Sequence, residues 1–252
     1  MLKTTRQNQI RRLVDEKGQA TVTELNEILD VSEATIRRDL EQMANLGWVQ
    51  RTHGGAVKVE PAGSEPPIEQ RLAEHAQEKE RIAAMAASLV NAGETIFLGS
   101  GSTVRKMTPY LTTIPNLTVI SNSLPVINEL AGSEVELIVI GGMLRQSELS
   151  MVGHVAELAM REFRADHVFM GIAALDVKQG LTSDFLPEAV TDRTILGIAR
   201  HCVIVADHSK FGRVNSVFLA PVTAADTIIS DDKVPPDLVR QLEETGVQVL
   251  LA

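Results

Sequence analysis

From residue 94 onward, short apolar and β-branched runs alternate with stretches of helical periodicity, and this alternation is what most constrains the fold. Runs of the first kind are predicted to form seven strands, at 95–98, 117–120, 135–140, 167–170, 202–206, 227–229 and 247–250. Strands separated by helices cross over and lie parallel, so the pattern predicts an α/β domain with a mainly parallel, Rossmann-like sheet. Ligands of such sheets bind beyond the carboxyl ends of the strands, which directs attention to the residues that follow each run.

A smaller segment with a different pattern precedes this domain. Residues 60–67 contain three prolines, a glycine and a serine, a composition typical of a connector. We therefore expect an amino-terminal domain at 1–59, a linker at 60–67 and a carboxy-terminal domain at 68–252. Residues 68–91 are rich in Ala, Glu, Gln and Arg and are predicted to form one helix.

The charge of the chain is unevenly divided. The net charge is −9, which argues against a nucleic-acid partner for the chain as a whole. Residues 1–60, however, hold nine Lys and Arg against nine Asp and Glu, so the excess of acid lies after residue 60. Two domains with different partners explain this division, and a chance distribution on a solvated surface is the alternative.

Two absences in the sequence indicate the compartment. No apolar run reaches eighteen residues, and residues 1–7 lack the apolar centre of a secretory signal. We therefore expect a cytoplasmic protein without a membrane partner. Cys202 is the only cysteine and lies in an apolar run, where a buried and unreactive thiol is expected, so disulfides and cysteine-based metal sites are excluded.

Before the linker, three helices are predicted from apolar residues at three- and four-residue steps. The first covers 5–17, the second follows a capping Thr21, and the third covers 33–46 after a capping Ser32. About three residues join the second helix to the third, which is the spacing of a helix-turn-helix.

The third of these helices has two different faces. Ile36, Leu40 and Met43 share one side and are predicted to be core. The other side is short, polar and cationic, which suits entry into the major groove of double-stranded DNA, because short residues permit close approach and Arg reaches guanine edges or phosphates. An ordinary solvated face is the alternative for this helix taken alone. The residues predicted to contact DNA from here are Ser32, Ala34, Thr35, Arg37, Arg38 and Gln42.

A hairpin is predicted directly after this helix. Strand-like runs at 48–52 and 56–59 flank His53-Gly-Gly, a turn signal, and a hairpin in this position is the wing of a winged helix-turn-helix. Arg51, His53 and Lys58 are expected to face the phosphate backbone or an adjacent groove.

The same segment resembles a known family. The run Val-Ser-Glu-Ala-Thr-Ile-Arg-Arg-Asp-Leu at 31–40, followed by Arg-Thr-His-Gly-Gly-Ala at 51–56, is similar to the signature of the DeoR family of bacterial sugar-metabolism regulators. The resemblance continues over nearly all of the chain. It implies a repressor of a carbohydrate-utilisation operon that binds double-stranded operator DNA as a homo-oligomer, a dimer or a tetramer.

The loop after the first predicted strand of the carboxy-terminal domain has the composition of a phosphate-binding loop. Gly99-Ser-Gly-Ser-Thr103 leads into a helix, its glycines let the backbone approach an anion, and its hydroxyls can donate. The loop lacks the endings of a Walker loop and of a dinucleotide fingerprint. A simple tight turn is the alternative.

Polar residues after the other strands are expected to complete the same pocket for a small phosphorylated metabolite. Among them, Lys210 can meet a phosphate as a point charge. For each residue taken singly, a turn or a solvated loop is an equal alternative. The residues predicted to bind the effector are Ser100, Gly101, Ser102, Thr103, Asn122, Ser123, Gly142, Arg145, Gly171, Asp176, Lys178, Gly180, Thr182, Glu188, Asp207 and Lys210.

Two of these runs, Gly99-Ser-Gly-Ser-Thr-Val104 and Val205-Ala-Asp-His-Ser-Lys210, also resemble ribose-5-phosphate isomerase. That enzyme carries an Asp-Gly-Ala-Asp motif at its fourth strand, where paired carboxylates assist proton transfer. The matching stretch here is Gly171-Ile-Ala-Ala174, without either carboxylate, although Glu188 can correspond to the enzyme's base. A pocket that keeps the phosphate-binding groups and lacks the acid pair is expected to bind a sugar phosphate without turning it over.

The sequence therefore predicts a two-domain transcription regulator that senses a phosphorylated sugar or a related metabolite, with no catalytic residue, metal or cofactor. Three alternatives stay open: an active sugar-phosphate isomerase with an appended reader, a non-specific architectural DNA binder, and a protein-interaction module.

Overall fold

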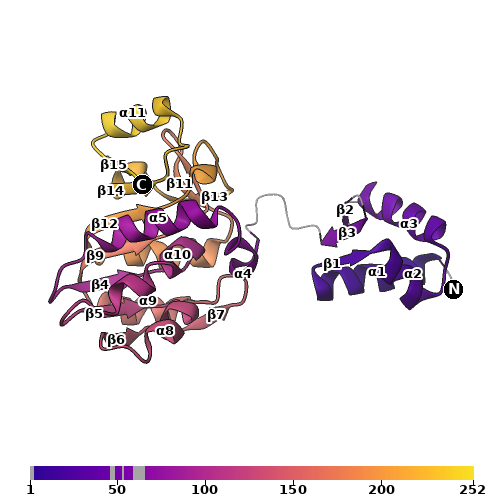
Figure 1. Ribbon diagram of the computed structural model, residues 1–252, viewed down its shortest axis with the longest axis horizontal. Coiled ribbons are helices and arrows are strands. Elements are labelled where there is room, and N and C mark those ends of the chain that lie inside the picture. The colour runs from indigo at the N-terminus through magenta and orange to yellow at the C-terminus, as the bar shows by residue number, and fades with distance from the viewer. Residues whose placement is uncertain (1–2, 46–48, 53, 59–65) are drawn as a thin grey trace. The chain divides into compact units, whose positions relative to one another are not determined.

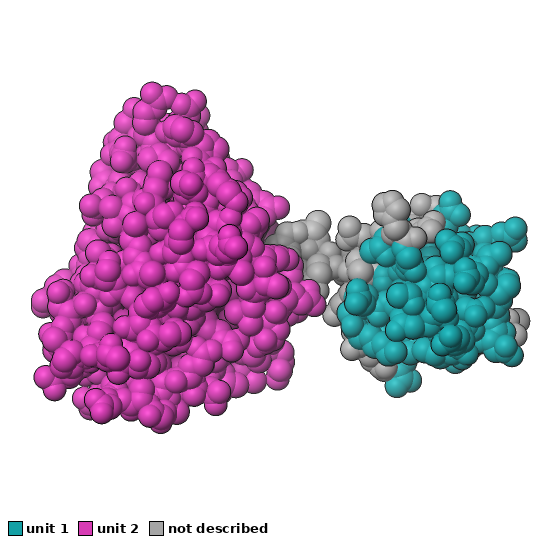
Figure 2. All heavy atoms as spheres, in the orientation of Figure 1, with its two compact units in different colours: residues 1–62 teal, residues 63–252 magenta. Residues whose placement is uncertain are grey.

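The computed structural model describes residues 3–45, 49–52, 54–58 and 66–252 (Figure 1). The chain divides into two compact units, 1–62 and 63–252 (Figure 2). This division falls inside the segment predicted as the linker, most of which lies outside the described residues. Among the residues that are described, no helix is both long and apolar enough to cross a membrane.

The amino-terminal unit is a helix-turn-helix with a small sheet. Its helices are α1 (Lys3–Lys17), α2 (Val22–Leu29) and α3 (Glu33–Asn45), close to the predicted bounds. The predicted wing is an antiparallel pair of β2 (Val49–Arg51) and β3 (Gly55–Lys58). A third strand, β1 (Gln19–Thr21), pairs with the other edge of β3 and was not predicted.

The core of this unit is the predicted one. Ile36, Leu40 and Met43 of α3 are fully buried and pack in one cluster with Ile10 of α1 and Leu25 of α2. The predicted helix end at Gly47 lies outside the described residues, as does His53 of the wing.

Seven parallel strands form the central sheet of the carboxy-terminal unit, in the order β15-β14-β12-β9-β4-β5-β6. Each corresponds to one of the seven predicted runs, so the α/β fold class with a mainly parallel sheet is confirmed. In chain order they are β4 (Thr95–Leu98), β5 (Thr118–Ser121), β6 (Glu136–Val139), β9 (Ala165–Met170), β12 (Ala199–Val205), β14 (Thr227–Ser230) and β15 (Gln248–Leu251).

Helices cover both faces of this sheet, because successive side chains of a strand point to opposite sides. Phe97 of β4 packs in one hydrophobic cluster, with α9 (His154–Arg161), α10 (Leu186–Leu196) and α11 (Pro236–Glu244). Its neighbours Ile96 and Leu98 pack in the other, with α5 (Ala76–Ala87), α6 (Ser102–Arg105), α7 (Thr108–Leu111) and α8 (Leu124–Leu130). The unit is therefore a three-layered sandwich (Figure 1).

The segment 68–91 is not the single helix that was predicted. It forms α4 (Ile68–Arg71) and then α5, with His75 in a left-handed conformation (φ 50°) directly before α5. A left-handed residue cannot continue an α-helix, so the chain changes direction there.

Two antiparallel additions to the parallel sheet were also not predicted. One is a hairpin of β7 (Met143–Arg145) and β8 (Ser150–Val152). The other is a sheet of β10 (Ala174–Asp176), β11 (Gly180–Ser183) and β13 (Val217–Ala220). Gly180 has a φ of +79° in this sheet, and a Cβ atom on it would lie 2.4 Å from the carbonyl oxygen of Ala220, so no other residue fits.

Candidate functional site

A cavity of about 50 Å³ lies at the carboxyl ends of the three central strands β4, β9 and β12. It is lined by the loop 99–103 after β4, by 171–173 after β9 and by 206–207 with Lys210 after β12. The remaining walls come from α4, α5, α10 and the loop of the β7–β8 hairpin. A polar hollow at this edge of a parallel sheet is where an α/β domain binds its ligand.

The loop after β4 presents buried hydroxyl groups to the cavity. Ser102 and Thr103 are only 3% and 6% exposed. Gly101 has a φ of +126°, which side chains rarely allow, and its carbonyl accepts the Arg105 N–H at 3.0 Å. The helix that follows, α6, has only four residues, so a helix end would add little to the attraction of an anion, and the hydroxyls and nearby cations would supply most of it.

Three cationic side chains line the cavity. Lys210 belongs to a short 3₁₀ turn, η1 (His208–Lys210), which Asp207 caps by accepting the Ser209 N–H at 3.0 Å. The other two, Arg71 of α4 and Lys79 of α5, were not predicted and are buried. The signal that could have found Lys79 is its position on the same helix face as Ile82, because a charge on an apolar stripe requires a buried partner.

The two unpredicted cations are held by protein groups. The Arg71 guanidinium forms a buried ion pair with Glu148, which lies in the β7–β8 loop and also lines the cavity. Lys79 donates to the carbonyl of Arg71 at 2.7 Å, and its Nζ lies 3.9 Å from a carboxylate oxygen of Asp207. Burial lowers the pKa of Lys79, and the nearby Asp207 opposes this shift.

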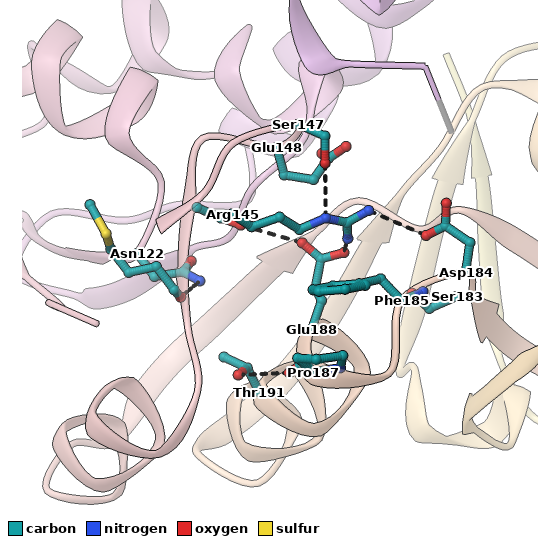
Figure 3. A network of polar contacts seen from close by, with 12 residues as sticks. Asn122, Arg145, Ser147, Glu148, Ser183, Asp184, Phe185, Pro187, Glu188 and Thr191 are labelled. Carbon is teal, nitrogen blue, oxygen red and sulfur yellow. Dashed lines mark hydrogen bonds and ion pairs between the residues drawn. The ribbon is translucent and has the colours of Figure 1, made fainter. Parts of the chain in front are cut away.

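The opposite wall is acidic and comes from α10. Glu188 and Asp192 lie one turn apart on this helix and both line the cavity. Figure 3 shows Arg145 of β7 reaching both Glu188, its ion-pair partner, and Asp184, whose carboxylate oxygen is 3.4 Å away. The Arg145 guanidinium also lies 4.6 Å from the ring centre of Phe185, a cation–π distance.

Burial raises the pKa of both carboxyl groups on this wall. The pKa of Glu188 is well above its ordinary value, mainly because of burial and then because of the neighbouring Asp192. Burial, with the nearby Glu148, raises the pKa of Asp192 to about 7. The cavity therefore has a basic, hydroxyl-rich side and an acidic side, on which burial favours the protonated form of Asp192.

The amino-terminal unit presents the predicted face of α3. Ala34, Arg37 and Arg38 are exposed, and Arg37 pairs with Glu33 one turn earlier at 3.1 Å. The motif residue Asp39 is instead buried and accepts from Arg6 of α1, so it joins two helices of the unit.

The other residues predicted to contact DNA are placed as follows. The Ser32 and Thr35 hydroxyls lie 3.0 Å apart at the start of α3. Gln42 is exposed, and its side-chain oxygen accepts from Gln7 at 3.3 Å. Arg51 lies in β2 and Lys58 in β3, at the two strands of the wing.

Comparison with known proteins decides the family. A model of the DeoR C terminal sensor domain matches residues 74–232, and a model of the DeoR-like helix-turn-helix domain matches residues 6–62. The chain belongs to the DeoR family. It is a DNA-binding transcription regulator with an attached sensor domain, as the sequence resemblance predicted.

Relatives of this DeoR-family chain match it along its whole length. The glycerol-3-phosphate regulon repressor of Escherichia coli K12 is 34% identical over 253 residues and covers 100% of both chains. The HTH-type transcriptional regulator GlpR of Haloferax volcanii is 32% identical over 250 residues, covering 99% of this chain and 98% of its own. Among solved structures, ribose 5-phosphate isomerase A from Methanocaldococcus jannaschii is 19% identical and covers 53% of each chain, with a TM-score of 0.40.

Half of the predicted effector residues of this DeoR-family domain lie together at the cavity. The eight lining residues are Ser100, Gly101, Ser102, Thr103, Gly171, Glu188, Asp207 and Lys210. Arg145 lies behind Glu188 and fixes it by an ion pair. The charged lining residues that were not predicted are Arg71, Lys79, Glu148 and Asp192.

The other predicted residues lie elsewhere and have structural partners. Three belong to the sheet of β10, β11 and β13, and Lys178 lies in the turn between β10 and β11. The Asp176 carboxylate accepts the N–H groups of Lys178 and Gln179 in this turn. Thr182 accepts the Asn215 N–H at 2.9 Å, and Gly180 permits the close strand contact.

Three more lie near the β7–β8 hairpin. The Asn122 side chain donates to the carbonyl of Met151 at 2.9 Å, and the backbone of Ser123 forms an isolated β-bridge with Ser150 of β8. A Cβ on Gly142 would lie 3.0 Å from that of Ala156, which indicates a packing role.

Proposed function

We propose that this chain represses a carbohydrate-utilisation operon and that a phosphorylated sugar or a related phosphorylated metabolite, bound in the cavity, controls its affinity for operator DNA. The observation that carries this proposal is the convergence of the Ser100–Thr103 loop with Arg71, Lys79 and Lys210 on one cavity. Hydroxyl groups and cations together bind phosphate strongly because each bond to the anion is charge-assisted. The E. coli relative is named for a phosphate ester, which supports the same ligand class.

The size of the cavity agrees with a phosphate group at its base. A water molecule needs roughly 10–15 Å³ of such space, so a cavity of about 50 Å³ has room for a group of a few heavy atoms. The remainder of the effector requires the acidic wall to shift. Binding would then favour one arrangement of the sensor domain, and a coupling on the order of 1–3 kcal/mol suffices for regulation.

The reader is expected to act in several copies. Residues 1–60 carry as many acidic as basic side chains, so one reader has little general attraction for DNA. Joining readers in a dimer or a tetramer raises the effective concentration of each at its half-site. The proposal therefore includes a homo-oligomer, in the cytoplasm, on double-stranded operator DNA.

The effector site is tested by Thr103→Ala and Lys210→Ala. Each variant should bind operator DNA normally and lose its response to phosphorylated sugars, because each loses a phosphate-binding group but no contact of the reader. Fluorescence anisotropy on labelled operator, with and without a panel of phosphorylated sugars, measures both properties. Lys178→Ala removes an exposed lysine of the same domain and is the matched control. A normal response in both cavity variants would refute this site.

The reader is tested by Arg38→Ala. This exposed side chain on α3 should contribute about 1–3 kcal/mol to operator affinity, and its loss should leave the melting temperature within about 1 °C because it is no part of the core. Arg240→Ala, an exposed arginine of α11, is the control. An unchanged operator affinity for Arg38→Ala would discredit the assignment of α3.

A second candidate function, isomerisation of a sugar phosphate, is favoured by the position of Glu188 at the cavity with a raised pKa, as a general base requires. We propose that the chain is not an enzyme, since Gly171-Ile-Ala-Ala174 supplies no carboxylate to assist proton transfer. An assay of ketose–aldose interconversion by the purified protein separates the two. Turnover by the wild type that disappears in Glu188→Ala would show that the chain is an isomerase and would overturn the proposal that it only binds its effector.

A further inference from the structure

The acidic wall of the cavity contains a group that the proposed phosphate site does not use. Asp192 lines the cavity and is partly buried, and no hydrogen bond or ion pair to its carboxyl is found among the described residues. Its neighbour Glu188 is engaged differently, through the ion pair with Arg145 and a 3.3 Å hydrogen bond from the Ser150 hydroxyl. Of the two carboxyl groups of this wall, Asp192 is therefore the one that is available to form a hydrogen bond with a ligand.

Two further polar atoms without partners lie next to the β7–β8 hairpin, which contacts this wall through Ser150. The side-chain oxygens of Asn122 and Ser123 are buried and accept no hydrogen bond in the described part of the chain. The backbone of Ser123 forms an isolated β-bridge with that of Ser150, and the Ser150 hydroxyl donates to Glu188. Figure 3 shows Asn122 and Glu188. Buried polar atoms without partners cost free energy and are rare in proteins, and two of the three found in the described residues belong to the segment that pairs with Ser150, beside Glu188.

We propose that Asp192 is the specificity-determining residue of the effector site and binds a hydroxyl group of the ligand, so that the cavity selects hydroxylated phosphate esters over plain alkyl ones. This inference rests on the proposed function, because it assumes that the phosphate occupies the side formed by the Ser100–Thr103 loop and Lys210. The hydroxyl-bearing part of the ligand then extends toward α10.

A hydroxyl fits this position better than an ammonium group does. An ammonium would be buried in a cavity that already holds Arg71, Lys79 and Lys210. A carboxyl whose pKa is about 7 can both donate to and accept from a hydroxyl near neutral pH, and a phosphate dianion in the same cavity favours its protonated form further. The neutral pairing therefore avoids burying a fourth cation.

The test compares esters that differ only in their hydroxyl groups. Ethyl phosphate is paired with 2-hydroxyethyl phosphate, and propyl phosphate with glycerol 3-phosphate; inorganic phosphate and 2-aminoethyl phosphate complete the set. Isothermal titration calorimetry on the full chain gives the dissociation constant of each. In the wild type, each hydroxylated ester should bind about tenfold more tightly than its alkyl partner, the effect of one buried hydrogen bond of about 1.4 kcal/mol.

The variants assign this preference to one side chain. In Asp192→Ala the ratio within each pair should fall below about threefold, whereas Asp192→Asn, which still accepts a hydrogen bond, should retain part of it. Asp192→Leu is a second apolar variant for use if the alanine variant does not fold. Glu157→Gln changes a carboxylate on α9 that contacts Thr191 of α10 but does not line the cavity, and should keep the full ratio.

Several results would overturn this assignment. Equal affinities within each pair in the wild type, an unchanged ratio in both apolar variants, or tighter binding of the aminoethyl ester than of the hydroxyethyl ester would each do so. Failure of the proposed function looks different, because inorganic phosphate and every ester would then fail to bind the wild type, and both proposals would fall. Phosphate binding without a ratio that depends on Asp192 overturns the specificity assignment alone.

Discussion

At the scale of single residues, the cavity joins groups that sequence patterns reveal to different degrees. Lys210 and Asp207 follow a strand, and Thr103 follows another, so the strand-end rule predicted them. Arg71 and Asp192 come from helices, and nothing local distinguishes them from surface charges. Their partners are distant in the sequence, such as Glu148 for Arg71, and only the folded chain brings these groups together.

The raised pKa of Asp192 predicts how stability depends on pH. Between the ordinary aspartate pKa of 3.8 and the folded value of about 7, the folded state keeps a proton that the unfolded state has lost, so the free energy of unfolding falls as pH rises. In Asp192→Asn, the amide that replaces the carboxyl group does not titrate in this range. The variant should melt at roughly the wild-type temperature at pH 4 and about 3–6 °C higher at pH 8, a difference of roughly 1–2 kcal/mol.

Thermal unfolding of both proteins without phosphate, followed by circular dichroism from pH 4 to pH 8, measures this difference. The other charged groups near Asp192 are common to both proteins: Glu188 on α10, Arg145 and Glu148 from the β7–β8 hairpin, Arg71, Lys79, Asp207 and Lys210. Asp192 also raises the pKa of Glu188, so the measured difference includes the change that the variant causes at Glu188. A constant difference across this range would show that the Asp192 carboxyl titrates normally.

At the scale of elements, the pattern of apolar residues predicted the long helices and the strands that are buried on both faces of the sheet. The inner strands of the seven-stranded sheet contain continuous apolar runs because helices cover both faces there, whereas the edge strands β6 and β15 are only partly buried. The helices α1, α2 and α3 each repeat apolar residues at helical steps. The antiparallel additions β7–β8 and β10–β11–β13 are too short to show a period, and β1 is fixed only by pairing with β3 across a gap of more than thirty residues. The break before α5 depends on a left-handed His75, a residue that carries no such signal.

The start of α2 gives a prediction at this scale. Thr21 accepts the Glu24 N–H at 3.2 Å while its own N–H donates to the Glu24 carboxylate at 2.8 Å, a complete capping box. Thr21→Ala should destabilise the amino-terminal unit by about 1 kcal/mol, because the Glu24 N–H loses its acceptor and the Glu24 carboxylate loses the hydrogen bond from the Thr21 hydroxyl. Urea unfolding measures this loss, with Thr23→Ala, an exposed change in the first turn of the same helix, as the control. Equal stability of the two variants would mean that the cap contributes nothing.

At the scale of the whole molecule, each unit has a hydrophobic core of its own. One core contains Ile10, Leu25 and Ile36, and the two faces of the central sheet build the rest. Cys202 lies in the larger unit, where burial raises the pKa of its thiol to about 12, in agreement with the expected unreactive cysteine.

Separate cores predict separate responses to a ligand. Differential scanning calorimetry of the full chain should resolve two transitions, and inorganic phosphate should raise only that of the larger unit, since a ligand stabilises the part that binds it. At a phosphate concentration of 100 times its dissociation constant the gain is about 2.7 kcal/mol. Thr21→Ala should lower only the other transition. A single transition, or a phosphate shift of both, would show that the two cores unfold together.

The order of the two units along the chain has a consequence for recombination between the genes of related proteins. Every residue that lines the cavity lies at or after Arg71, and the boundary between the units lies at residues 62 and 63. A crossover in this short interval would graft a foreign reader onto an intact sensor. Recombination can therefore change the set of genes controlled and the metabolite sensed independently, because each property is encoded by one continuous segment of the chain.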